Sequence, residues 1–194
     1  MQGNNNIYLL GHMVVRESEL VHLNLCMDLY VAERLDSEHD GHARIITRLN
    51  WNAATACQFA FNCANRVYKY CKGHHELVDI AHGLAKQRST DPSVSGIITR
   101  GTTKIDVALS LEWATAEWWR ERHFYAARAV GACLAHEPYA AAVGAAYCAR
   151  RAMGKKSGAE EAWQLAHLLA IIHHIHRPGE GKNFVDIWDP HERD

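Results

Sequence analysis

Histidine and aspartate recur in one stretch of the sequence at a spacing that suits metal binding. His75, Asp79 and His82 are separated by four and three residues, so a helix would present all three on one face. Neutral imidazole and carboxylate groups are ligands for Zn, Mn or Fe. A metal-dependent hydrolase or redox bundle built on these residues, joined by His39 or Asp40, is therefore one hypothesis for function.

Chance alone explains much of this pattern. With 14 histidines among 194 residues, neighbouring His and Asp are expected without any function. The sequence contains no H-E-x-x-H, G-x-S-x-G, G-x-G-x-x-G or P-loop motif. We therefore predict no catalytic residue and no cofactor, and keep Zn, Mn or Fe for the alternative hypothesis.

Aromatic and basic residues gather over residues 112–128. This stretch includes Trp118, Trp119 and Arg122. Adjacent residues on a helix point about 100° apart, so the two tryptophans cannot both face one core. Tryptophan beside arginine is typical of the residues that dominate protein interfaces. These three residues are predicted to bind a partner protein; the alternative is that both tryptophans pack beneath a neighbouring helix or the tail.

The C-terminal tail over residues 183–194 carries four large apolar side chains. Such residues in a tail usually dock on the body of the protein or on a partner. We expect a docked tail whose Trp188 and Asp189 complete the predicted partner-binding surface.

A second group of basic residues supports a third hypothesis. Arg150, Arg151, Lys155 and Lys156 suit a helix C-terminus, where the helix dipole favours positive charge. They also suit a helical subunit of a nucleic-acid-processing complex. However, Lys plus Arg total 21 against 22 for Asp plus Glu. This balance makes nucleic acid an unlikely direct general ligand.

The composition is that of a globular, mainly helical chain. Hydrophobic residues make up 48% and charged residues 22%, which excludes wholesale disorder. Only 4 prolines interrupt an alanine-rich sequence, and alanine is the strongest helix former. The 6 cysteines form no C-x-x-C pair and are predicted to be reduced core thiols. Without a signal-like start or a membrane-length apolar run, the chain is expected to be cytoplasmic and unattached to membranes.

These patterns predict an all-α bundle of about seven helices in a single domain over residues 1–194, with a hinge or long loop at 89–102. Residues 7–10 and 13–15 are expected to form an apolar hairpin or docked arm. The periodicity predicts helices over residues 18–35, 50–71, 75–88, 103–121, 123–136, 138–153 and from 157 to just before 178.

Residues 50–153 combine a helix carrying the run Cys63–Val67 (CANRV), a second helix after a His-containing turn, and a loop leading into Ala-rich helices. In this order the stretch resembles the helical immunity-protein domains of bacterial toxin systems. The resemblance implies a cytoplasmic, non-enzymatic protein that neutralises a toxin or complex subunit by covering its active surface. It carries over no catalytic residue. The apolar arm, the Trp118-Trp119 pair and the Trp-bearing tail depart from the family pattern.

Overall fold

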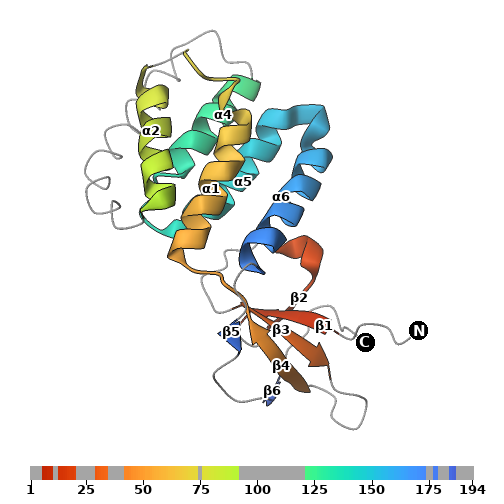
Figure 1. The fold of residues 1–194 in the computed structure, drawn as a ribbon. Coiled ribbons are helices and arrows are strands. Elements are labelled where there is room, and N and C mark those ends of the chain that lie inside the picture. The colour runs from red at the N-terminus through yellow and green to blue at the C-terminus, as the bar shows by residue number, and fades with distance from the viewer. Residues whose placement is uncertain are drawn as a thin grey trace. The chain divides into compact units, whose positions relative to one another are not determined.

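The chain divides into two compact units (Figure 1). A sheet unit comprises residues 1–51 and 169–194, and a helical unit comprises residues 52–168. The predicted hinge at 89–102 falls within the helical unit, and residues 92–102 lie outside the described residues. The structure is a computed structural model that describes residues 6–10, 13–20, 29–34, 42–73, 76–91, 121–173, 177–178 and 184–186.

The sheet unit is an antiparallel sheet in the order β2-β1-β3-β4-β5, with β6 also paired to β4. The predicted apolar hairpin is confirmed, because β1 pairs with β2. A short 3-10 helix follows it over Glu17–Glu19. The strands are β1 (Asn6–Leu10), β2 (Met13–Val15), β3 (Leu29–Arg34), β4 (His42–Arg48), β5 (Arg177–Pro178) and β6 (Phe184–Asp186).

A small apolar cluster holds the sheet unit together. Leu9 of β1 pairs with Val14 of β2 and with Tyr30 of β3. Leu9 and Val14 are buried with Ala32 and Ala43, while Tyr30 packs at the margin. Side chains two apart on a strand share a face, so Tyr30 and Ala32 belong to the same layer. β6 adds three residues of the C-terminal tail to this sheet.

The prediction of an all-α chain is wrong for this unit. The helix expected over residues 18–35 is replaced at its C-terminal end by β3, where Tyr30 and Val31 are types that favour strands. Pairing on both edges, with β1 and with β4, outweighs the helical spacing of the apolar residues. The chain remains mostly helical, but the count of about seven helices is not confirmed. The helix expected over 103–121 lies almost wholly outside the described residues.

The helical unit is a bundle in which α5 packs against α1 and α4, and α2 packs beside α1 and α4 (Figure 1). Among the described residues, no helix has both the length and the apolar character needed to cross a bilayer. The helices are α1 (Ala53–Tyr68), α2 (Glu76–Thr90), α4 (Glu121–Ala132), α5 (Pro138–Met153) and α6 (Ser157–Ile172), with a 3-10 turn over Gly154–Lys156. The last residues of α6, from Leu169 on, belong to the sheet unit.

Small side chains allow α1, α4 and α5 to approach closely. Nearly all buried residues of these helices are Ala, Cys or Val, and many are fully buried. A Cβ added at Gly144 of α5 would lie only 3.3 Å from the Cβ of Ala132 on α4. By contrast, α6 contacts α1 and α5 through larger polar side chains. The alanine-rich composition therefore builds one tight three-helix contact.

Capping residues fix where these helices begin and end. Asn52 Oδ1 accepts a hydrogen bond from the Thr55 N–H at 3.1 Å, and Thr55 Oγ1 accepts one from the Asn52 N–H at 2.8 Å. Glu137 caps α5 ahead of Pro138. Gly154 ends α5 with φ +55°, a region that favours glycine.

Replacing Asn52 with alanine is expected to lower the free energy of unfolding by about 1 kcal/mol, because two amide groups of the first turn of α1 lose their acceptor. Asn52→Asp keeps an acceptor and should stay near the wild-type value. Urea unfolding followed by circular dichroism measures both. Equal losses in the two variants would show that the side-chain oxygen does not stabilise the helix start.

Candidate functional site

Asp79 and His82, two of the three predicted metal ligands, form hydrogen bonds and a ring contact with residues of α1. Asp79 Oδ1 accepts a hydrogen bond from the Tyr68 hydroxyl at 2.6 Å and another from the Gly73 N–H at 3.2 Å. His82 stacks face to face on Tyr68, with ring centroids 3.7 Å apart, and its Nε2 lies 3.0 Å from Asn65 Oδ1. Both side chains therefore attach α2 to α1.

The third predicted ligand, His75, lies outside the described residues, as do His39 and Asp40. Within the described part of the chain, no three His, Cys, Asp or Glu side chains are grouped so that they could hold a metal ion. The structure thus brings two of the predicted ligands, Asp79 and His82, to the same tyrosine, Tyr68 of α1. These contacts form without a metal ion.

Burial favours the neutral form of two histidines in the helical unit. Burial lowers the pKa of His82 below its ordinary value of 6.5, and the nearby Lys86 and Lys72 lower it further against the opposing effect of Asp79. Burial and Arg66 likewise lower the pKa of His167. The unfolded chain therefore binds these protons more tightly than the folded one.

We expect acidification to destabilise the helical unit. The contribution of a histidine with a depressed pKa is fully present above pH 6.5 and is lost as the pH falls through its folded value. Urea unfolding measured from about pH 7.5 to about pH 5 should show falling stability. The double variant His82→Gln, His167→Gln should show a weaker pH dependence. An unchanged slope in that variant would contradict the assignment to these two histidines.

The described cysteines offer no reactive thiol. All five are buried and form no disulfide, as expected for core thiols. Burial raises the pKa of every one, to about 12 for Cys71. A thiol with a raised pKa is a poor nucleophile and a poor metal ligand at neutral pH. The described cysteines are Cys57, Cys63, Cys71, Cys133 and Cys148.

Basic side chains lie over tyrosine rings at one end of the helical unit. The Arg122 guanidinium lies 4.9 Å from the centre of the Tyr70 ring, and Lys69 Nζ lies 5.2 Å from the same ring. The Arg151 guanidinium lies 5.0 Å from the Tyr125 ring, and its Nη2 donates a hydrogen bond to the Tyr125 hydroxyl at 3.4 Å. These five residues form what we call the Arg–Tyr face.

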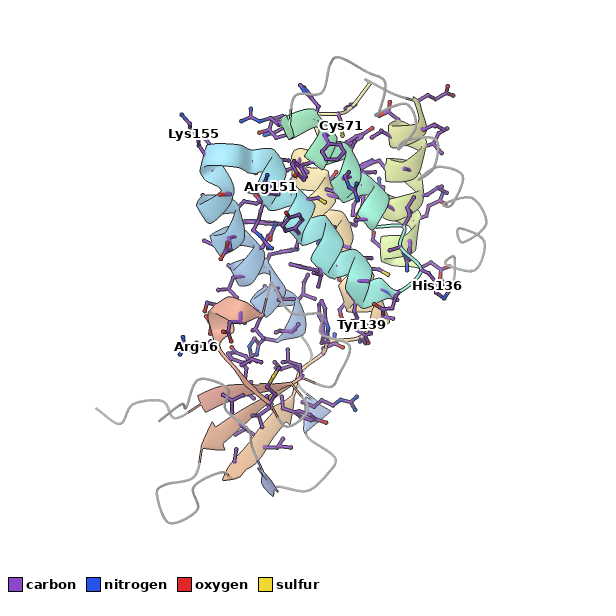
Figure 2. All side chains as sticks on the ribbon, turned by 180° about the vertical axis from the view of Figure 1, so that it is seen from behind. Arg16, Cys71, His136, Tyr139, Arg151 and Lys155 are labelled. Carbon is purple, nitrogen blue, oxygen red and sulfur yellow. The ribbon has the colours of Figure 1, made fainter. Side chains whose placement is uncertain are left out.

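Three segments contribute to the Arg–Tyr face: the turn that directly follows α1, the first half of α4 and the end of α5. The Tyr70 hydroxyl lies 3.8 Å from Met153 Sδ, which ties the end of α1 to that of α5. Figure 2 shows Cys71, Arg151 and Lys155 toward this end of the unit, while His136 lies toward the other. Arg128 extends the pattern by lying 5.5 Å from the Phe124 ring.

Stacking on an aromatic ring gives an exposed arginine an ordered position. Arg122 and Arg151 are both exposed, whereas Tyr70 and Tyr125 are half-buried. Each such pair contributes about 0.5–1 kcal/mol at an exposed site. The guanidinium group is planar and carries five N–H donors. Such a group can bind a planar carboxylate with little further loss of side-chain entropy.

Of the five residues predicted to bind a partner, the structure places one. Arg122 lies on the Arg–Tyr face, and Trp118, Trp119, Trp188 and Asp189 lie outside the described residues. Tyr125 belongs to the aromatic stretch singled out in the sequence, but sequence reasoning missed Tyr70, because no local pattern pairs a ring just after α1 with an arginine far along the chain.

The predicted basic cluster divides into a buried and an exposed part. Arg150 is only 8% exposed, and its Nη1 donates to Gln164 Oε1 at 2.6 Å. Arg151 is exposed, as are Lys155 and Lys156 in the turn between α5 and α6. Adjacent helical residues point about 100° apart, which places Arg150 in the core and Arg151 at the surface. Arg150 is thus not available as part of a surface stripe.

A buried polar network joins α1, α5 and α6. Arg66 Nε donates to Glu160 Oε2 at 3.0 Å, and the Gln164 amide donates to Glu160 Oε1 at 3.3 Å and to the Ala146 carbonyl at 3.0 Å. Gln164 in turn accepts from Arg150. The network satisfies a carboxylate and an amide that are both fully buried.

A pocket opens beside this network, with a volume of about 390 Å³. Arg151 belongs both to this pocket and to the Arg–Tyr face. The pocket lies between the end of α5 and the start of α6 and is lined by Tyr147, Arg150, Arg151, Gly154, Ser157 and Glu161.

Comparison of the chain with protein-family models, with curated proteins and with solved structures gave no match.

Proposed function

We propose that this chain is a cytoplasmic protein-binding protein of the immunity or inhibitor kind, which blocks a toxin or a complex subunit by covering its active surface. The observation that supports this function is the Arg–Tyr face. Arginine and tyrosine are the residue types that dominate the energetics of protein interfaces. Ordering of the arginines on rings before binding reduces the entropic cost of association.

The face is better suited to protein than to nucleic acid. Proteins that bind single-stranded nucleic acid stack its bases on exposed aromatic rings. Here Arg122 and Arg151 already lie over Tyr70 and Tyr125. These rings therefore offer less aromatic surface on which bases could stack, while guanidinium groups also bind the carboxylates of a protein surface.

The proposal is tested by capturing the partner with full-length protein and with two variants. Arg122→Ala removes a central side chain of the face, and Lys86→Ala removes an exposed charge on α2. Lys86 is a suitable control because Arg88, two residues on, contacts the far end of α4. Circular dichroism should show that both variants keep the wild-type helicity.

We expect wild-type protein and Lys86→Ala to retain one partner protein in near-equal amount from a lysate of the organism that encodes the chain. Arg122→Ala should weaken its binding about tenfold or more. Nuclease treatment should leave the complex intact. Equal retention by both variants, or loss of the complex on nuclease treatment, would contradict the proposed function.

A further inference from the structure

The pocket between α5 and α6 has a basic lining. Its charged groups are the guanidinium groups of Arg150 and Arg151 and the carboxylate of Glu161. Lys155 and Lys156 lie exposed in the turn that connects the two helices. A group that enters this pocket therefore meets a local excess of positive charge, which favours an anion.

One of the two guanidinium groups is held firmly in place. Arg150 donates to Gln164 at 2.6 Å, and the Gln164 amide is fixed by the Ala146 carbonyl and by Glu160. Gln164 is fully buried, so these bonds form in a site without competing water. The pocket thus has a preorganised guanidinium at its inner side and Arg151 at its outer side.

The helical unit as a whole carries a charge of the same sign. Over residues 52–168 there are 14 Lys and Arg against 10 Asp and Glu, whereas the remaining residues hold 7 against 12. An acidic protein is steered toward such a surface.

We propose that this pocket receives a carboxylate side chain from an acidic surface of the partner protein, an inference that rests on the proposed function. The carboxylate binds the guanidinium groups of Arg150 and Arg151 and competes there with Glu161. The Arg–Tyr face then contacts the residues around that anchor.

Titration of the full-length protein with a fluorescein-labelled oligoglutamate peptide, followed by fluorescence anisotropy at low salt, tests this inference. Glu161→Gln removes the competing carboxylate and should tighten binding about threefold. Arg151→Gln should weaken it about tenfold. Lys86→Gln, on α2, is the matched control and should leave affinity unchanged. Thermal unfolding checks that each variant is folded.

Two results from the variants would overturn the proposed pocket while leaving the proposed function standing. These are an unchanged affinity in Glu161→Gln, or binding that falls in Arg122→Gln but stays the same in Arg151→Gln. In both, the pocket does not bind the peptide. Tighter binding of labelled oligothymidylate than of oligoglutamate would overturn both proposals, since nucleic acid would then be the favoured ligand. If oligoglutamate fails to bind the wild-type protein, the proposal of a carboxylate pocket is overturned and the proposed function still stands.

Discussion

Replacing Arg88 with methionine is expected to lower the free energy of unfolding by about 3 kcal/mol or more. Arg88 is 2% exposed and reaches from α2 to the end of α4. Its Nη1 donates to the Cys133 carbonyl at 2.7 Å and to the Ala135 carbonyl at 2.5 Å, and its Nη2 donates to the His136 carbonyl at 3.2 Å.

The cost arises because these carbonyls lie just beyond α4, where the helix leaves acceptors unsatisfied and its dipole is negative. Methionine fills the space of the arginine stem but supplies no donor. Arg88→Lys keeps one charged donor and should recover part of the loss. Lys86→Met, at an exposed position on the same helix, should change stability by less than about 0.5 kcal/mol.

Urea unfolding followed by circular dichroism measures this series. We expect the order wild type, Lys86→Met, Arg88→Lys, Arg88→Met from most to least stable. If Arg88→Met unfolds at the wild-type urea concentration, water replaces the guanidinium at these carbonyls, and Arg88 does not hold α2 to α4.

The Arg66–Glu160 ion pair should respond asymmetrically to removal of its two partners. The Glu160 side chain is fully buried, whereas that of Arg66 is 38% exposed. Arg66→Met leaves a buried carboxylate without its cation and should cost about 3 kcal/mol. Glu160→Gln leaves an arginine that can turn toward water and should cost about 1 kcal/mol.

A double-mutant cycle separates this asymmetry from loss of packing. Arg66 also lies 3.9 Å from the Trp163 ring, a contact that Arg66→Met removes. If the unpaired charge of Glu160 dominates, Arg66→Met, Glu160→Gln should be more stable than Arg66→Met alone. A double variant whose loss equals the sum of the single losses would show that packing on Trp163 causes the effect.

Local signals in the sequence predict the helical unit well. Pro138 and Gly154 bracket α5, and its predicted bounds agree with the structure. The predicted helix from Asn50 corresponds to α1, which Asn52 caps two residues later. These features depend on residues close together in the chain, which is why periodicity and capping preferences suffice.

Contacts between distant segments explain what the sequence could not predict. β3 lies where apolar residues have helical spacing, and it is a strand because β1 and β4 pair with it. Arg122 was predicted to be an interface residue, but its ring partner Tyr70 comes from the turn after α1. The different burial of Arg150 and Arg151 likewise depends on Gln164 of α6.

Titration of the captured partner's own activity with the full-length protein tests the central claim most directly. The account predicts that activity falls to zero at one equivalent of wild-type protein or of Lys86→Ala. It predicts that Arg122→Ala must be added at a concentration about tenfold higher to reach half inhibition. A partner that stays fully active while bound, or that is inhibited equally by all three proteins, would contradict inhibition through the Arg–Tyr face.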